Sequence, residues 1–291
     1  LLLFVAAAAF AMTTTAQTTT IESGADEVIN YWDNTSAPHS NCDSKAEKIT
    51  ESSGKYKVSH TTETVFYIFK PQRATGHSLV IFPGGGYKTV NLNFGWAKWL
   101  ADQGITTMVV KYRLPNGHSE VPLEDAQQAL RYMRANGTSW GVDPKQVGIL
   151  GSSAGGYLAG HTSNVTPDDE KPQFSILIYS VISGMRRSRP RSTFGLMLGE
   201  KRTDSEEYYY SLENRVSPTT PPTLLLLADD DLTVPTISST RYYKALKYHG
   251  VKAAMHIFPS GGHGWSGHND YLYAEPSKAA ISDWLKIQQV G

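Results

Sequence analysis

The feature that most constrains this 291-residue chain is the stretch 147–156, which reads VGILGSSAGG. A short apolar run ends at a glycine, a serine flanked by small residues comes next, and the sequence after it has helical character. Gly151-x-Ser153-x-Gly155 therefore matches a nucleophile elbow, a sharp turn from a strand into a helix that exposes a serine oxygen beside helical N–H groups. Glycines two positions either side remove the Cβ atoms that would clash in such a turn. The pentapeptide alone also suits an ordinary glycine loop, so its meaning depends on the rest of the chain.

Charge and cysteine content exclude several classes of function. Lys plus Arg equal Asp plus Glu at 27 each, so no net field favours nucleic acid or an anionic membrane, and small neutral substrates fit best. The single cysteine, Cys42, excludes an intramolecular disulfide and a multi-cysteine metal site. We therefore expect no metal, no other cofactor and no nucleic-acid partner.

The first 16 residues have the pattern of a signal peptide with a truncated start. Residues 1–12 form an unbroken apolar run, and Thr14 and Ala16 place small side chains at positions −3 and −1 of a cleavage site. A membrane-spanning helix would need about 20 apolar residues, so the run is too short to cross a bilayer. Because no cysteine stands at the cleavage point, we expect no lipid anchor. The mature protein is expected to begin near Gln17 and to be periplasmic or extracellular.

Strand and helix patterns alternate along most of the remaining chain. Apolar and β-branched runs predict strands at 64–70, 78–82, 105–112, 147–150, 174–179, 223–228 and 253–258. Helical spacing of apolar residues predicts helices at about 90–103, 122–136, 236–249 and 276–288. The alternation indicates an α/β fold with a doubly wound, mostly parallel sheet.

Residues 185–217 interrupt this alternation, with an arginine-rich run at 186–191 and three consecutive tyrosines at 208–210. An insertion of this kind predicts a small cap over the site. We find no internal repeat and no second domain boundary. Residues 55–291 are therefore expected to form one domain, preceded by a polar segment at 17–54 in which no periodicity is sustained.

A buried ion pair is expected within this scaffold. Arg113 follows the predicted strand at 105–112, and Asp125 lies in the first turn of the helix that follows it. Charged side chains at such positions are buried only when they are paired. We therefore interpret the two residues as structural partners rather than as catalytic groups.

Three residue types that can form a catalytic triad follow three of the predicted strands. Sites in open α/β sheets form beyond the carboxyl ends of the strands. Ser153 follows the strand at 147–150, three aspartates at 229–231 follow the strand at 223–228, and His263 follows the strand at 253–258. A serine hydroxyl becomes a useful nucleophile when an imidazole accepts its proton and a carboxylate holds the other ring nitrogen. The chain order Ser, Asp, His is the order that α/β-hydrolases use.

Two members of this triad have alternatives. All three aspartates stand at the strand end, and we favour Asp231 because the sequence after it runs straight into the next helix. Asp230 is the second choice. For the base, we favour His263, which lies in a glycine-rich loop, and His268 is the alternative because it is close in sequence.

Backbone donors for the developing oxyanion are also predicted. The N–H of Ala154 at the start of the helix supplies one, and the glycine loop 84–86 after the strand at 78–82 can supply others. The same glycines would also suit an ordinary tight turn. A phosphate-binding loop is disfavoured because no Gly-Lys-Ser/Thr follows.

Six short motifs together resemble secreted bacterial α/β-hydrolase carboxylesterases of the acetylesterase and acetylxylan-esterase-like group, often labelled xylanase accessory proteins. The motifs are FPGGGY at 82–87, KYRLP at 111–115, LGSSAGG at 150–156, TPPT at 220–223, DxxVP at 231–235 and GGHGW at 261–265. The resemblance extends from about Tyr31 to the C-terminus. It is specific for the fold and for the carboxylesterase type, and less specific for the substrate.

The resemblance implies an α/β-hydrolase fold, a triad of Ser153, Asp231 and His263, and no cofactor. It further implies that Gly85, Gly86 and Ala154 are the oxyanion donors. The activity it implies is removal of acetyl or other short acyl groups from plant polysaccharide or oligosaccharide, such as acetylated xylan. The choice between xylan and pectin, the sugar position and the oligomeric state stay open.

Two other functions are compatible with parts of the pattern. A serine peptidase of the prolyl-oligopeptidase type has the same fold and triad. Such peptidases resemble one another in having a tyrosine after the nucleophile, where this chain has Ala154, and we expect no propeller domain before the hydrolase region. A non-catalytic binding protein on the same fold would have no chemical need for all three triad groups.

Overall fold

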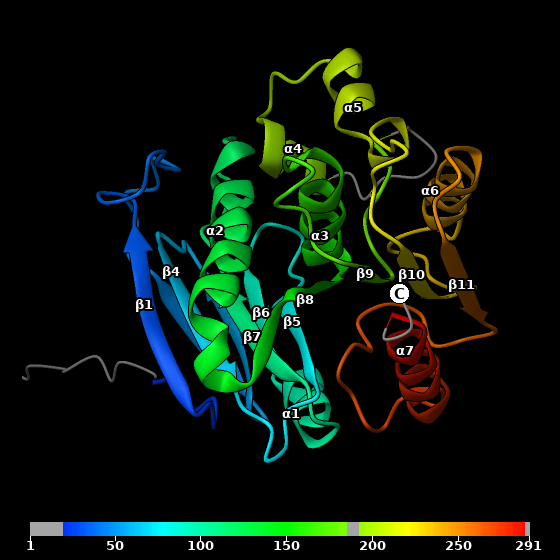
Figure 1. Cartoon of the computed structure of the whole chain (residues 1–291). Coiled ribbons are helices and arrows are strands. Elements are labelled where there is room, and N and C mark those ends of the chain that lie inside the picture. Colours follow the sequence, from blue (N-terminus) through cyan, green and yellow to red (C-terminus); the bar gives the residue numbers. More distant parts are fainter. Residues whose placement is uncertain (1–19, 185–191, 289–291) are drawn as a thin grey trace, which may run out of the picture.

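The computed structural model describes residues 20–184 and 192–288, and its main feature is an eight-stranded sheet with strand order β1-β4-β7-β5-β8-β9-β10-β11 (Figure 1). The strands are β1 (Glu27–Asp33), β4 (Glu63–Phe69), β5 (Gly76–Phe82), β7 (Thr106–Lys111), β8 (Val142–Ser152), β9 (Ser175–Ile178), β10 (Thr223–Ala228) and β11 (Ala253–Phe258). β4 pairs antiparallel with both β1 and β7, and all neighbours from β7 to β11 pair in parallel.

Helices flank this sheet. The longer ones are α1 (Gly95–Asp102), α2 (Glu120–Asn136), α3 (Ser153–Val165), α6 (Ile237–Tyr248) and α7 (Ala274–Gln288). α2 and α3 lie side by side and pack on β8 (Figure 1), whereas α1 packs on β7, α6 on β11 and α7 on β10. The predicted α/β fold with a doubly wound, mostly parallel sheet is confirmed.

The central strands are the most buried part of the molecule. Every residue of β7, β9 and β10 is buried. A parallel strand covered on both faces needs apolar side chains at consecutive positions rather than at alternate ones. This explains why the continuous apolar runs in the sequence identified these strands well.

A second, three-stranded antiparallel sheet was not predicted. It consists of β2 (Lys48–Ser52), β3 (Lys55–Ser59) and β6 (Val90–Leu92). β2 and β3 form a hairpin whose two turn residues, Ser53 and Gly54, have φ of 52° and 72°, as a tight two-residue turn requires.

The polar segment at 17–54 contains two strands that were not predicted, because β1 pairs with β4 at the edge of the main sheet and β2 pairs with β3. The helix predicted from residue 90 begins only at Gly95, since Val90–Leu92 pairs with β3. In both cases pairing with a distant segment outweighs the local pattern.

The Arg113–Asp125 ion pair is confirmed. Arg113 Nη2 and Nε lie 2.7 and 3.0 Å from Asp125 Oδ1, and the Arg113 backbone N–H donates to Oδ2 at 2.7 Å. Trp32 Nε1 also donates to Oδ1, at 2.7 Å. Both charged side chains are fully buried. The pair fixes the end of β7 to the first turns of α2.

The insertion forms α4 (Thr193–Leu198), α5 (Asp204–Tyr210) and the short 3₁₀ turn η2 (Leu212–Asn214). A second 3₁₀ turn, η1 (Gly137–Trp140), follows α2. The expected signal peptide at 1–16 and the arginine-rich run at 186–191 lie outside the described residues. Within residues 20–184 and 192–288, no helix is both long and apolar enough to cross a membrane.

Candidate active site

Ser153 stands at a strained turn between β8 and α3. Its φ is 54°, in the left-handed region that residues with a Cβ atom rarely adopt. A Cβ atom on Gly151 would lie 2.2 Å from the carbonyl oxygen of Gly155, and a Cβ on Gly155 would lie 2.1 Å from that of Phe82. These contacts are impossible for any other residue, so the glycines allow the turn that exposes Ser153.

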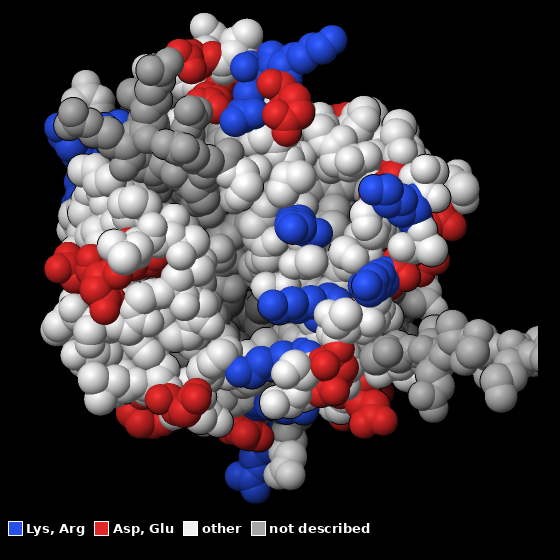
Figure 2. Space-filling view, turned by 180° about the vertical axis from the view of Figure 1, so that it is seen from behind, with Lys and Arg blue, Asp and Glu red and all other residues white. Residues whose placement is uncertain are grey.

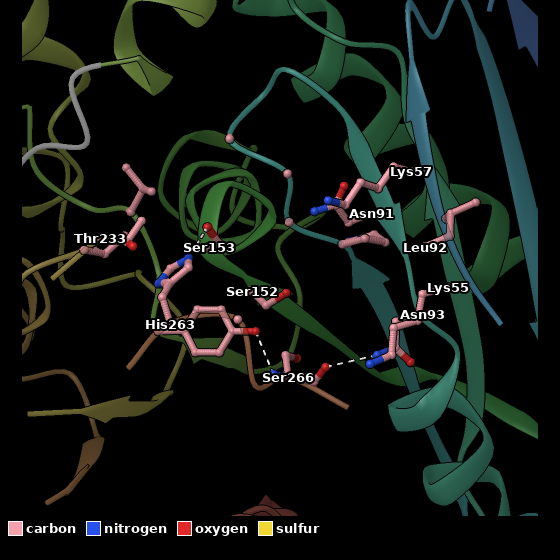
Figure 3. Close-up of a pocket in the computed structure, with 18 of the residues that line it drawn as sticks. Lys55, Lys57, Asn91, Leu92, Asn93, Ser152, Ser153, Thr233, His263 and Ser266 are labelled. Atoms are coloured by element: carbon pink, nitrogen blue, oxygen red, sulfur yellow. Dashed lines mark hydrogen bonds between the residues drawn. The ribbon is translucent and has the colours of Figure 1, made fainter. Parts of the chain in front are cut away.

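His263 joins Ser153 to a carboxylate. Ser153 Oγ lies 2.8 Å from His263 Nε2, and His263 Nδ1 lies 2.7 Å from Asp231 Oδ2. Because a carboxylate accepts at Nδ1, that nitrogen carries the ring proton and Nε2 presents its lone pair to the serine hydroxyl. Figure 3 shows the ring of His263 directed at Ser153. The structure thus brings the three predicted triad residues into one hydrogen-bonded chain.

The loop after β10 fixes the position of the Asp231 carboxylate, which is fully shielded from solvent. Its Oδ1 accepts from the backbone N–H groups of Thr233 and Val234 at 2.8 and 2.9 Å. Oδ2 is therefore left for the histidine. An aspartate is suited to position 231 because its side chain accepts from the backbone N–H groups two and three residues later, which stabilises the turn that leads into α6.

Asp230, the alternative acid, has a different set of partners. Its carboxylate accepts from the backbone N–H groups of Gly261 and Gly262 at 3.2 and 2.7 Å. Asp230 therefore holds the loop that carries His263, and it makes no hydrogen bond to the ring. That loop contains three glycines with positive φ, at 261, 262 and 264. A Cβ at Gly261 would lie 2.2 Å from the Tyr271 ring.

His268, the alternative base, is not beside the serine. Its ring nitrogens lie 3.0 and 3.3 Å from Lys55 Nζ, on another part of the pocket lining. Burial and the nearby charge of Lys55 lower the pKa of His268. Its ring is consequently neutral at neutral pH and can accept a hydrogen bond from the Lys55 ammonium.

Two of the predicted oxyanion donors line the same pocket as the serine, and the third follows it in the chain. Gly85 and Gly86 line the same pocket as Ser153, and both have positive φ. A Cβ on neighbouring Gly84 would lie 3.0 Å from the Ser153 Cβ, so bare backbone approaches the nucleophile here. Ala154 is buried in the first turn of α3, where N–H groups have no partner within the helix. Together these groups could polarise a carbonyl oxygen held at Ser153.

Tyr179, at the end of β9, is a site residue that sequence reasoning missed. Its ring centroid is 4.6 Å from that of His263, and its hydroxyl accepts from the Ser266 backbone N–H at 2.7 Å. Burial raises the pKa of Tyr179 to about 12, so it stays protonated. The strand-end rule that identified the triad would have identified Tyr179 too.

The triad opens into a cavity of about 480 Å³. On the side away from His263, it is lined by residues of the second sheet and the segment after it, which include Lys55, Lys57, Asn91 and Asn93. Ser192 and Thr193, at the start of α4, also contribute, so the insertion forms part of the wall. Within the described parts of the chain, no group of three or more His, Cys, Asp or Glu residues could hold a metal ion.

Comparisons with known proteins agree with this architecture. The model of the prolyl oligopeptidase family matches residues 97–286. An acetylxylan esterase of Xylanibacter ruminicola is 36% identical over 225 residues, which are 75% of this chain and 47% of that protein. Endo-1,4-beta-xylanase B of Butyrivibrio fibrisolvens is 30% identical over 213 residues, 67% of this chain and 33% of that protein. The chain thus spans half or less of the length of these relatives.

Among solved structures, the acetyl ester-xyloside bifunctional hydrolase of Caldicellulosiruptor lactoaceticus superposes with a TM-score of 0.68. The two are 32% identical, and the match covers 77% of this chain and 87% of that one. The resemblance indicated by the six sequence motifs is confirmed by these matches.

Proposed function

The chain belongs to the prolyl oligopeptidase family, and from that premise we propose that it is a serine carboxylesterase that removes acetyl or other short acyl groups from plant polysaccharide or oligosaccharide, such as acetylated xylan. The observation that carries the proposal is the hydrogen-bonded chain from Asp231 through His263 to Ser153 at the edge of the cavity. The acetylxylan esterase and the xylanase among its relatives support the substrate class.

Acylation begins when Ser153 Oγ attacks the ester carbonyl carbon and His263 Nε2 accepts the serine proton. Asp231 holds the Nδ1 proton in place and stabilises the imidazolium that forms. The N–H groups of Ala154, Gly85 and Gly86 donate to the oxyanion. The ester C–O bond then breaks, His263 protonates the sugar oxygen, and the acyl group remains on Ser153.

Deacylation repeats these steps with water. His263 Nε2 accepts a proton from a water molecule as the water oxygen attacks the acyl carbon. The Ser153 ester bond breaks, the serine recovers its proton from the imidazolium, and the carboxylic acid leaves. Asp231 remains ionised throughout, since its role is to orient and stabilise the ring.

The decisive experiment is acetate release from acetylated xylan together with cleavage of p-nitrophenyl acetate. Both activities should vanish in Ser153→Ala and persist in Ser139→Ala, which removes the hydroxyl of an exposed serine on η1. Turnover that persists in Ser153→Ala would contradict the proposal.

The family match also favours a second candidate, a serine peptidase of the prolyl-oligopeptidase type. Ala154 follows the nucleophile, where the resemblance to those peptidases leads us to expect tyrosine. Proline-containing chromogenic peptides measured beside the acetyl esters distinguish the two. A higher kcat/KM for the peptides would favour the peptidase.

We further propose that the protein is exported, that residues 1–16 are its signal peptide, and that residues 55–291 are the hydrolase domain with its cap-like insertion at about 185–217. The apolar run at 1–12 supports export. Mass spectrometry of the protein expressed with its own leader should find a mature N-terminus near Gln17. A mature protein that retains the leader would contradict this part of the proposal.

A further inference from the structure

The cavity wall farthest from His263 is built from the second sheet. Lys57 on β3 is paired in register with Asn91 on β6, so their side chains lie on the same face. Lys55 is two residues before Lys57 and shares that face. The alternate residues Tyr56 and Val58 are buried. Figure 3 shows Lys55, Lys57 and Asn91 on the side of the pocket opposite His263.

The formal charges on the described cavity lining are all positive. Lys55 and Lys57 line it, and no Asp or Glu among the described residues does. Within those residues the Lys57 ammonium has no ion-pair partner, and Lys55 contacts only the neutral ring of His268. The Asp270 carboxylate lies 3.8 Å from His268 Nδ1 and is 90% exposed. Figure 2 shows Lys and Arg side chains along one side of a hollow on this face.

The polar side chains of this wall offer mainly hydrogen-bond donors. The Asn91 Oδ1 accepts from the Thr89 hydroxyl at 2.7 Å, which leaves the Asn91 NH₂ group directed elsewhere. Asn93 is already committed, because its Oδ1 accepts from the Gly95 N–H and its Nδ2 donates to the Ser266 carbonyl. Two ammonium groups and one amide NH₂ are therefore available as donors, whereas the Asn91 Oδ1 already accepts one hydrogen bond.

We propose that this donor wall, formed by Lys55, Lys57 and Asn91, binds a carboxylate carried by the ester substrate. The proposal rests on the proposed function for the reaction at Ser153 and names the chemical class of its substrate. A neutral sugar hydroxyl both donates and accepts, whereas a carboxylate only accepts and gains from charge-assisted bonds. A uronic acid unit beside the acylated sugar would supply the group, and so would a dicarboxylic acyl chain.

A substrate that carries a carboxylate differs from the neutral substrate expected from the net charge of the whole chain. The balance of 27 basic and 27 acidic residues describes the entire sequence. Substrate selection depends on the local field inside the cavity, where low-dielectric walls concentrate it.

Binding tests the uronic acid source without requiring turnover. Ser153→Ala protein is titrated calorimetrically with a xylotetraose that carries one glucuronic acid branch, and with the same oligosaccharide after reduction of its carboxyl to an alcohol. We expect the acid to bind about five- to tenfold more tightly at low salt, and the preference to shrink as salt is added. Adding Lys57→Met should abolish the preference. Adding Lys244→Met, at an exposed lysine on α6, should leave it unchanged.

A kinetic arm tests the acyl source. Active protein is assayed with p-nitrophenyl hemisuccinate and with p-nitrophenyl butyrate, and a preference for the hemisuccinate that Lys57→Met removes would assign the carboxylate to the acyl group. Equal binding of both oligosaccharides together with no preference in the kinetic arm would overturn the inference. A protein that hydrolyses no acetyl ester but still binds the acidic oligosaccharide preferentially would contradict the proposed function and support the donor wall.

Discussion

Two buried carboxylates, Asp125 and Asp231, differ in what their partners can do. Both side chains are fully shielded from solvent and accept hydrogen bonds from backbone and side-chain donors. Asp125 binds Arg113, whose guanidinium stays protonated in proteins and is itself fully buried. Asp231 binds His263, whose other nitrogen faces Ser153 at the cavity.

The difference shows how one chemical group serves two purposes. The partners of Asp125 all lie within the scaffold. Its interaction with Arg113 therefore stabilises the packing of β7 against α2. The contacts of Asp231 continue to a nucleophile, so its charge acts on a proton that moves. Burial of an acid therefore does not by itself indicate catalysis; the chemistry of its partner does.

The largest expected effect is on activity, from Asp231→Asn. The amide would favour the wrong histidine tautomer, and we expect kcat to fall by roughly 10⁴ while the melting temperature changes little. Asp230→Asn is the matched control and should retain kcat within about tenfold, because the Asp230 carboxylate accepts from the backbone of the histidine loop and not from the His263 ring. Ester hydrolysis and thermal unfolding of both variants measure this. A nearly wild-type rate in Asp231→Asn would show that Asp231, like Asp125, has no catalytic role.

Next in size is the stability loss expected for Arg113→Met. It leaves the Asp125 carboxylate buried without a counter-charge, with the backbone N–H of residue 113 and Trp32 Nε1 still donating to it. The free energy of unfolding should therefore fall by about 3 to 5 kcal/mol. Arg131→Met breaks a more exposed pair with Glu170 and should cost about 1 kcal/mol or less. Urea denaturation tests both. The rate per folded molecule should stay unchanged, and a large fall in kcat for Arg113→Met would show that Asp125 is not purely structural.

His161 provides a buried titratable group of a third kind, packed between Tyr157 and Tyr210. Burial lowers the pKa of His161 to about 4, so the unfolded chain takes up its proton first as pH falls. The fold should lose up to roughly 3 kcal/mol from this residue between pH 6.5 and 4. His161→Phe should flatten that part of the stability profile. Parallel profiles for the two proteins would show that His161 does not couple to folding.

The smallest effect, from Tyr179→Phe, would sharpen the description of the triad. It removes the hydroxyl that accepts from Ser266 while keeping the ring against His263. We expect kcat to fall about five- to tenfold with KM nearly unchanged, since one hydrogen bond of about 1 kcal/mol is lost. Tyr179 is thus interpreted as a positioning residue. A change confined to KM would instead place its hydroxyl in contact with substrate.

The sequence was informative where structure depends on local pattern. The strands at Thr223–Ala228 and Ala253–Phe258 were predicted with their observed bounds. The glycine spacing around Ser153 also predicted the turn, because its need for bare backbone is a local steric matter.

Long-range pairing limited what the sequence could predict. β6 has only three residues and is a strand because it meets β3, more than 30 positions earlier. The donor wall depends on that pairing, so no local motif marks it. The division of roles between Asp230 and Asp231 likewise follows from the fold of two loops, which bring Gly262 to one acid and His263 to the other.

The backbone of Ser153 has an evolutionary consequence. A left-handed conformation costs a residue with a Cβ atom roughly 1 to 2 kcal/mol, and glycine adopts it freely. Selection for thermal robustness alone would therefore replace this serine with glycine and lose the nucleophile. The serine at this position has a φ of 54°. Its presence there, where glycine would be more stable, is the result expected from selection for turnover.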